Sequence, residues 1–480
     1  MIATQLKQKK SSVDLTEGPI LAKIIKFILP LMATNFLQTF YNAADMMVVS
    51  MSSEANAVGA IGATGSLTNL MINIFMGFAV GSNILVARYL GAKDHDRVSK
   101  TVHTSIIMSL LFGAVTTLIG LFASRSILHM MGADGSVLDL ATLYTKIYFC
   151  GAPFLAATNY LSAIFRAKGD TKTPLIVLSI SGMINVALNL LFVLGFGMSV
   201  EGVATSTAIA NALSAVTLLF LLSKDDGPCK VSKDKFKLDK RAFAGIVREG
   251  LPAGIQGSLF SISNIVMQSS IFSVNNALVG ASSEYAPVLN GVSATANLDS
   301  FINTAINSVY QASITFTSQN FGAQKYKRIK KVMLATTLLS IAIGMSVSGF
   351  MIIFRAPLLS LYGIKDGVEG SMEHLAYQAS LVRMTFVTAP YFLLGFMNVT
   401  TGVMRGLGKT MTSTIISLVG ACLLRILWIY SVPYVFPNVE PFTRLGLIYL
   451  AFSITWLITG MAQLICSLFI LRAKTREIRA

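Results

Sequence analysis

Residues 20–49 read ILAKIIKFILPLMATNFLQTFYNAADMMVV, and this run of mostly apolar side chains decides the fold. A helix of this length rises about 45 Å, which exceeds the ~30 Å hydrocarbon core of a bilayer. Similar runs of about 20 or more residues recur along the chain, separated by short polar clusters. The buried strands of a soluble α/β protein would instead last about 4–8 residues. The pattern predicts an all-α polytopic membrane protein.

The composition agrees with a membrane protein. The 480 residues are 54% hydrophobic and 12% charged, whereas ordinary soluble proteins carry about 25% charged residues. Residues 1–19 are polar, and the first apolar run is longer than the core of about 7–15 residues in a signal peptide, so we expect no cleavable signal. The four cysteines are scattered and show no spacing typical of disulfides or zinc sites. We therefore expect no cofactor.

Twelve apolar segments are predicted to span the membrane. Those well over 20 residues long imply tilted or projecting helices. An even number of spans places both termini on one side of the membrane. The predicted spans are 20–49, 56–87, 103–124, 138–165, 173–196, 201–222, 243–274, 290–319, 332–354, 371–402, 411–436 and 443–471.

The loops on the two sides differ in positive charge. Of the 38 Lys and Arg residues, 31 fall on the side that carries both termini, and four fall in the opposite loops. Because cytoplasmic loops carry an excess of Lys and Arg, we expect both termini in the cytoplasm. The net charge of +16 is then a topology signal. We find no nucleic-acid-binding motif and expect no nucleic-acid partner.

The two halves of the chain repeat each other in order. Pro30 corresponds to Pro252, Gly91 to Gly322, and Lys146 to Arg383. Six spans in each half make the repeats enter the membrane from the same side, so we expect two six-helix lobes related by a pseudo-two-fold axis along the membrane normal. The predicted parts are a tail (1–19), an N-lobe (20–222), a linker (223–242), a C-lobe (243–471) and a second tail (472–480).

The repeated motifs resemble the multidrug and toxin extrusion (MATE) family, and most closely its bacterial DNA-damage-inducible branch. The matching segments are LPLMATNFLQTFYNAAD (29–45), ARYLGA (87–92), FRAKGDTKTP (165–174), GFGMSVEGVATSTA (195–208) and FTSQNFGAQKYKRI (316–329). The resemblance covers essentially the whole chain. It implies a secondary antiporter that exports small amphipathic, cationic organic compounds in exchange for H⁺ or Na⁺, through alternating access of the two lobes.

Asp45 is a carboxylate inside the first predicted span. A charge in hydrocarbon costs at least a few kcal/mol, so the group needs a cavity, a partner or a proton. One reading places Asp45 at the outer interface, 19 residues beyond Lys26. The other uses the spacing of polar residues, which puts a stripe on one helical face toward the lobe interior. The candidate cavity residues of this span are Asn35, Gln38, Tyr41, Asn42 and Asp45.

The resemblance also implies a cation-coupling site in the N-lobe. By motif, its members fall on Asp45, Asn185, Asn189 and Thr207. Asn189 stands where many relatives have Asp, and the missing acid favours a proton site centred on Asp45; amide oxygens still allow Na⁺, and we expect no other metal. Tyr144 is a further cavity candidate. Pro30 has two readings. A proline near a helix start is tolerated and can be purely structural; Pro30 also lies where the first-span proline of some relatives lets the helix bend, which implies a gating role.

Asp299 is the acid candidate of the C-lobe, in the eighth predicted span. Asn303 and Asn307 follow it at helical spacing, so the three form a second polar stripe. A purely structural reading pairs Asp299 with an intramembrane base such as Arg425. Both readings stay open from the sequence.

Two other classes of function are alternatives to an antiporter. A lipid-linked saccharide flippase of the same superfamily is the first alternative, but it would need a basic cavity and more spans. A membrane-embedded enzyme would need clustered His, Cys or acids, whereas the four His residues are dispersed, so we do not expect an enzyme. The expected partners are small organic substrates and membrane lipids, and the expected form is a monomer in the bacterial cytoplasmic membrane.

Overall fold

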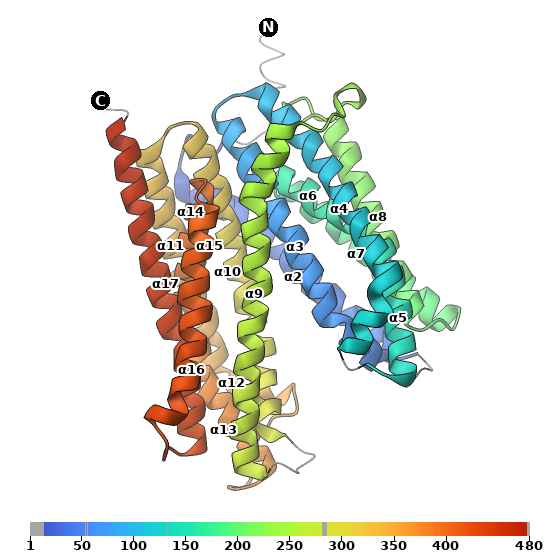
Figure 1. Ribbon diagram of the computed structural model, residues 1–480, viewed down its shortest axis with the longest axis vertical. Helices are drawn as coiled ribbons and strands as arrows, with labels where there is room; N and C mark the ends of the chain where they lie inside the picture. The colour runs from blue at the N-terminus through green and yellow to red at the C-terminus, as the bar shows by residue number, and fades with distance from the viewer. Residues whose placement is uncertain (1–13, 53, 55, 132, 281–285, 478–480) are drawn as a thin grey trace. The chain divides into compact units, whose positions relative to one another are not determined.

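The computed structural model describes residues 14–52, 54, 56–131, 133–280 and 286–477. Residues 1–13 and 478–480 of the predicted tails lie outside the described residues. Every regular element within the described ranges is a helix, which confirms the predicted all-α class (Figure 1). The elements are α2 (Ile20–Val49), α3 (Ala57–Gly91), α4 (His95–Met130), α5 (Gly135–Cys150), α6 (Ala152–Ala167), α7 (Lys172–Leu190), η1 (Leu191–Gly195), α8 (Val200–Ser223), η2 (Lys233–Lys235), α9 (Lys240–Val279), α10 (Pro287–Gly322), α11 (Tyr326–Ile353), α12 (Arg355–Ser360), α13 (Met372–Arg383), η3 (Met384–Thr388), α14 (Tyr391–Gly406), α15 (Thr410–Ser417), η4 (Leu418–Leu423), α16 (Leu424–Val435) and α17 (Pro441–Glu477).

Each predicted span coincides with one of these helices or with a run of adjoining helices. Among the described residues, nine helices are long and apolar enough to cross a membrane, and the bent pair α5–α6 adds a tenth. The helices α9 and α10 occupy the predicted seventh and eighth spans but are rich in Ser, Asn and Gln. Their polarity places them outside the apolar set, although both are 36 residues or longer.

The fourth predicted span is broken. We expected one segment over 138–165, whereas α5 and α6 bend by 49° at Gly151. Pro153 lies in the first turn of α6, where its missing N–H costs no helical hydrogen bond. The bend also seats Pro153 on Gly113 of α4, where an added Cβ would lie 2.3 Å from the Pro153 Cα.

The chain forms two compact units. The first comprises Met1–Gly257 with Ser318–Lys325, and the second comprises Ser258–Thr317 with Tyr326–Ala480. Two helices are divided by this boundary: α9 begins in the first unit, and the last residues of α10 belong to the first unit although the rest of α10 does not.

Glycines let helices of the first unit approach closely. A Cβ added to Gly77 on α3 would lie 2.4 Å from the backbone N of Gly254 on α9, and one added to Gly81 would lie 2.6 Å from the Ile246 carbonyl oxygen. Lipid offers no hydrophobic drive for helix association, so membrane helices rely on such small-residue contacts. The start of α9 is therefore fixed against α3.

The second unit holds one buried amide among hydroxyl groups. Gln463 on α17 is fully buried. Its Oε1 accepts hydrogen bonds from Thr400 and Thr401 Oγ1 at 3.2 and 2.7 Å, and its Nε2 donates to Ser417 Oγ at 2.8 Å and to Ser413 Oγ at 3.4 Å. Because an unpaired amide is costly in an apolar interior, this network specifies how α14, α15 and α17 pack.

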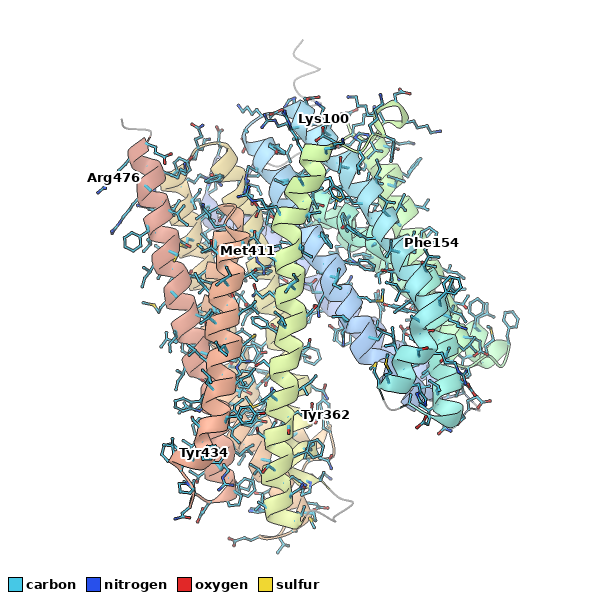
Figure 2. All side chains as sticks on the ribbon, in the orientation of Figure 1. Lys100, Phe154, Tyr362, Met411, Tyr434 and Arg476 are labelled. Carbon is cyan, nitrogen blue, oxygen red and sulfur yellow. The ribbon has the colours of Figure 1, made fainter. Side chains whose placement is uncertain are left out.

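Large apolar side chains cover the outside of both units. Phe122, Ile353 and Phe469 are 81, 76 and 64% exposed. Phe154 on α6 and Met411 on α15, both labelled in Figure 2, are likewise exposed. An apolar exterior of this extent is typical of surfaces that contact membranes or partners.

The linker between the predicted lobes packs onto the first unit. Cys229 is 1% exposed, and Lys168 pairs with Asp225 at 3.1 Å with both side chains 7% exposed. The buried His103 on α4 accepts from the Ser232 N–H through Nε2 at 3.1 Å, and its Nδ1 lies 2.7 Å from the Ser99 carbonyl oxygen. These bonds make the segment part of the folded unit.

Candidate functional site

Asp45 lies near the end of α2, beside two asparagines of α7. Asn189 Nδ2 donates to Asp45 Oδ1 at 2.5 Å. Asn189 is fully buried, and Asn185 is 5% exposed, whereas Asp45 is half-buried. Amide donors thus cover one side of the carboxylate, and the rest of the side chain stays partly exposed.

Asn185 extends this contact to α8. In the amide orientation that satisfies both of its ends, Asn185 nitrogen donates to Asp45 Oδ1 at 2.9 Å and its oxygen accepts from the Thr207 N–H at 3.3 Å. Thr207 Oγ1 donates to the Val203 carbonyl oxygen at 2.9 Å. The structure therefore brings together all four residues to which the resemblance assigned cation coupling.

One oxygen of this cluster is buried with no hydrogen-bond donor. Among the described residues, no group donates a hydrogen bond to Asn189 Oδ1, although a buried amide oxygen normally accepts at least one. It belongs to the side chain that donates to Asp45. Next to a carboxylate, this amide oxygen is one ligand of the kind that hard cations prefer.

Two tyrosines of α5 border the cluster. Tyr144, predicted as a cavity residue, is buried, and its ring stacks on that of Tyr148 with centroids 5.7 Å apart. Both pack in one apolar cluster with Val48 of α2 and Val203 of α8. Sequence reasoning missed Tyr148, although its position four residues after Tyr144 places it on the same helical face.

The polar stripe of α2 does not join Asp45 in this cluster. Gln38 and Asn42 are exposed, and Asn35 is half-buried. Tyr41 contacts α7 instead, where its hydroxyl donates to the Ser179 carbonyl oxygen at 3.1 Å. Of the five predicted residues on this span, Asp45 is the one that hydrogen-bonds to these asparagines in the described part of the chain.

Asp299 is paired with a base other than the one named from sequence. The structural reading offered Arg425 as an example, but Arg383 Nε and Nη2 donate to Asp299 Oδ2 at 3.1 and 2.9 Å, and Thr388 Oγ1 donates to Oδ1 at 2.6 Å. Arg425 instead lies over the Phe452 ring at 4.0 Å. Asn303 is exposed. The geometry agrees with the structural reading of Asp299.

A π-helical turn adjoins each of these polar clusters. η1 begins two residues after Asn189, and η3 contains Thr388. Such turns are rare and occur often at functional sites, because they redirect side chains within a helix. Nothing in the sequence identifies them, which is why Thr388 was missed.

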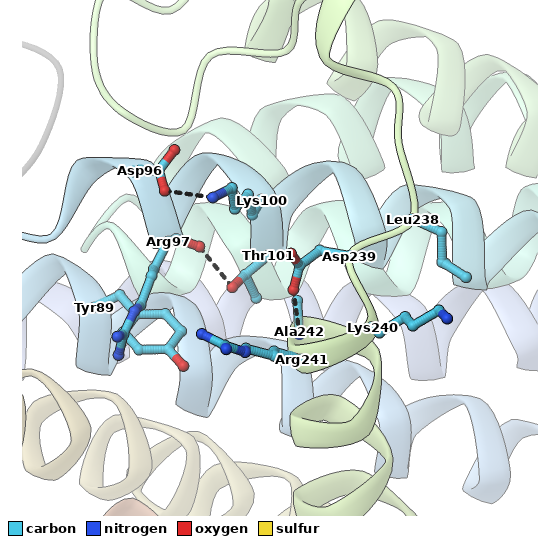
Figure 3. A pocket seen from close by; sticks show the side chains of 10 residues that line it. All are labelled: Tyr89, Asp96, Arg97, Lys100, Thr101, Leu238, Asp239, Lys240, Arg241 and Ala242. Carbon is cyan, nitrogen blue, oxygen red and sulfur yellow. Dashed lines mark hydrogen bonds and ion pairs between the residues drawn. The ribbon is translucent and has the colours of Figure 1, made fainter.

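A separate pocket of about 600 Å³ lies at the other end of α3 from Asp45. Figure 3 shows its lining, in which Lys100 pairs with Asp96 at 2.6 Å and Asp239 Oδ1 accepts from the Ala242 N–H at 2.8 Å. The pocket lies against the first turns of α4 and α9. Its charged, loop-side lining distinguishes it from the membrane cluster around Asp45.

Comparison with known proteins gives consistent results. The MatE family model matches residues 30–191 and 261–431, well over half of the chain. The probable multidrug resistance protein YoeA of Bacillus subtilis is 28% identical over 417 residues, covering 85% of each chain. The multidrug export protein MepA of Staphylococcus aureus is 24% identical over 420 residues, covering 86% of this chain and 88% of that protein.

A solved structure has the same fold. It is described as the outward-facing conformation of a multidrug resistance MATE family transporter of the MOP superfamily, with a TM-score of 0.86 and 19% identity over 97% of this chain and 99% of that chain. The family match, the helical fold and the cluster at Asp45 lead to one conclusion. The chain belongs to the multidrug and toxin extrusion (MATE) family of transporters.

Proposed function

We propose that this chain is a secondary antiporter that exports small amphipathic, cationic organic compounds in exchange for a cation bound at Asp45. The observation that carries the proposal is the contact of the half-buried Asp45 with Asn189 and Asn185. The printed names of the relatives YoeA and MepA, multidrug resistance and multidrug export, support the substrate class.

Competition at one carboxylate is sufficient for antiport. A cation that neutralises Asp45 lowers its attraction for a cationic substrate, and the substrate lowers its affinity for the cation to the same degree. Alternating access then carries the two ligands in opposite directions. Pro30 supports a gating role because it lies inside α2, where a proline removes a backbone hydrogen bond and favours a bend.

We propose H⁺ as the coupling ion. The coupling site has a single carboxylate, and Asn189 and Asn185 direct N–H groups at it, which is a poor arrangement for a fully coordinated metal ion. One observation favours Na⁺ as the second candidate: Asn189 Oδ1 is buried and has no partner. For either ion, the proposed cation site consists of Asp45, Asn185, Asn189 and Thr207.

The buried bases support export of cations over flipping of lipid-linked saccharides. A diphosphate would need accessible Arg or Lys side chains. Arg383 is committed to Asp299, and Arg425 lies against Phe452 and donates to Thr455 Oγ1 at 3.3 Å. We further propose that the chain lies in the bacterial plasma membrane as a monomer. The loop charges support an orientation with both termini in the cytoplasm.

The test is transport by the purified protein in liposomes. An imposed pH gradient, acidic on the side opposite the substrate, is expected to drive uphill movement of a fluorescent organic cation. An Na⁺ gradient at equal pH gives the same movement if Na⁺ is the ion. Failure of both gradients, with movement of a lipid-linked saccharide instead, would replace the proposal with the flippase.

A further inference from the structure

A short strap at the start of the chain, residues 14–17, is bound to a segment about 300 residues away. The Leu15 N–H donates to Gln319 Oε1 at 3.1 Å, and Asn320 Nδ2 donates to the Leu15 carbonyl oxygen at 3.3 Å. Both backbone groups of Leu15 are therefore paired with side chains of one segment. Leu15 is 1% exposed, Gln319 is 4% exposed, and Asn320 is fully buried.

Two further groups close the contact. Gln319 Nε2 donates to the Ala167 carbonyl oxygen at the end of α6 at 2.7 Å, so its amide bridges the strap and α6. Lys325 Nζ donates to the Thr16 carbonyl oxygen at 3.2 Å and pairs with Glu17 Oε1 at 3.3 Å. The strap thus binds Ser318–Lys325 at both ends.

Two reciprocal glycine contacts also join the end of α3 to the end of α10. A Cβ added to Gly322 would lie 1.9 Å from the Arg88 carbonyl oxygen, and one added to Gly91 would lie 1.9 Å from the Gln319 carbonyl oxygen. Gly91 and Gly322 are equivalent positions of the sequence repeat, and so are Arg88 and Gln319, each pair 231 residues apart. The two copies of the motif therefore make the same contact with each other. Their backbones lie so close together that only glycine fits at Gly91 and Gly322.

The boundary between the two units crosses α10 at the start of this segment. Residues 287–317 of α10 belong to the second unit, and Ser318–Lys325 belongs to the first. The last turn of α10 is thus held to the first unit while the rest of the helix belongs to the second. The strap also lies just before α2, which begins at Ile20 and carries Asp45, so one continuous stretch of chain joins the fastening to the proposed cation site.

We propose that the strap is a latch that fastens Ser318–Lys325 to the first unit and that its release is a step of the transport cycle; the second part rests on the proposed antiport. The latch is a conformational device and not a substrate site. It opens when the bonds of Gln319, Asn320 and Lys325 to the strap break, and it closes when the reciprocal glycine contacts form again.

Cross-linking tests the role in transport. Leu15→Cys and Asn320→Cys are introduced together after replacement of Cys150, Cys229, Cys422 and Cys466, and a short reducible thiol reagent joins them. We expect joining to stop export of the organic cation and reduction to restore it, whereas the reagent leaves Asn320→Cys alone active. Export by the joined protein at the rate of the reduced protein would overturn the proposal.

Labelling tests the latch without any need for transport. A Leu15→Cys thiol is expected to react slowly with a maleimide, and Gln319→Leu, which removes two buried hydrogen bonds, is expected to raise the rate about tenfold. Lys325→Gln also raises it, while Lys327→Gln, an exposed lysine two residues beyond the segment on α11, does not. Equal rates in Lys325→Gln and Lys327→Gln together with no effect of Gln319→Leu would contradict the latch.

Glycine variants give an independent readout. Gly322→Ala forces the last turn of α10 away from Arg88, so we expect faster labelling of Leu15→Cys. Gly349→Ala is the control, because a Cβ there meets no atom within 4 Å. If the unmodified protein exports no organic cation under any gradient, the proposed function fails, and the labelling rates alone then decide whether the latch stands.

Discussion

Arg383 holds a single oxygen of Asp299 with two hydrogen bonds, from Nε at 3.1 Å and Nη2 at 2.9 Å to Oδ2. The Asp299 and Arg383 side chains are 3 and 14% exposed. Both residues lie in helices that we take to span the membrane, so each charge neutralises the other where water is scarce. The acid candidate of the C-lobe is thereby paired with a built-in cation, and in the proposed mechanism Asp45 is the acid that exchanges ligands.

Arg383→Met is expected to lower the free energy of unfolding by about 3–5 kcal/mol, because it leaves Asp299 buried without its partner. The combined variant Asp299→Leu and Arg383→Met is expected to recover most of that loss. Denaturation in detergent measures both. The control is Arg125→Met, which breaks an exposed pair with Asp139 and should cost less than about 1 kcal/mol. Equal losses for the two Arg variants would contradict the structural role.

Asn189→Asp is expected to make export respond to Na⁺. The substitution places a second carboxylate against Asp45, and two carboxylates with amide oxygens attract Na⁺ far more strongly than one does. Transport at fixed pH, with and without an Na⁺ gradient, measures the change. Asn189→Leu is the matched variant without charge and should lose coupling to either ion. An Asn189→Asp protein with the ion dependence of the unmodified protein would remove Asn189 from the site.

Gln463→Leu is expected to lower the free energy of unfolding by about 1–2 kcal/mol, because Ser417 and the neighbouring hydroxyls lose a buried partner. Part of the loss is avoided, since Thr400 and Thr401 also donate to carbonyl oxygens of their own helix. Gln268→Leu, at an exposed position of α9, serves as the control and should change little. Thermal unfolding in detergent distinguishes the two.

Cys229 is expected to resist thiol reagents in the folded protein. Burial raises the pKa of the Cys229 thiol to about 12, and only the thiolate reacts. The folded pKa lies above the ordinary value of about 8.5, so at about pH 8 the thiolate fraction is roughly a thousandfold smaller than in a free thiol, and it grows as pH rises. Lys237→Cys, exposed in the same linker, should react fast. Similar rates at the two positions would show that the linker is not packed as described.

Much of the fold could be predicted because apolar periodicity and charge act locally. The helix α2 begins and ends where the apolar run of residues 20–49 does, and the repeat motifs placed Gly91 and Gly322 at corresponding helix ends. The break at Gly151 could not be predicted from hydropathy, since both sides of it are apolar. It depends on the fit of Pro153 against Gly113, which is a tertiary contact.

The candidate site was predicted only in part. Asp45, Asn185, Asn189 and Thr207 were named through the family resemblance, and no spacing along the chain would have brought α2, α7 and α8 together. The structural reading of Asp299 named the right kind of partner, an intramembrane base, but its example, Arg425, is not that partner. Arg383 and Arg425 are both bases within spans, and sequence does not say which one faces α10. The strap was missed entirely, since its bonds join residues some 300 positions apart.

The central claim is that Asp45 exchanges a cation for the substrate. The most direct measurement compares Asp45→Asn with Asp139→Asn, an exposed acid of the same unit, in liposomes under an imposed ion gradient. We predict that Asp139→Asn accumulates the organic cation as the unmodified protein does and that Asp45→Asn loses all gradient-driven accumulation. Undiminished gradient-driven accumulation by a folded Asp45→Asn protein would contradict the account.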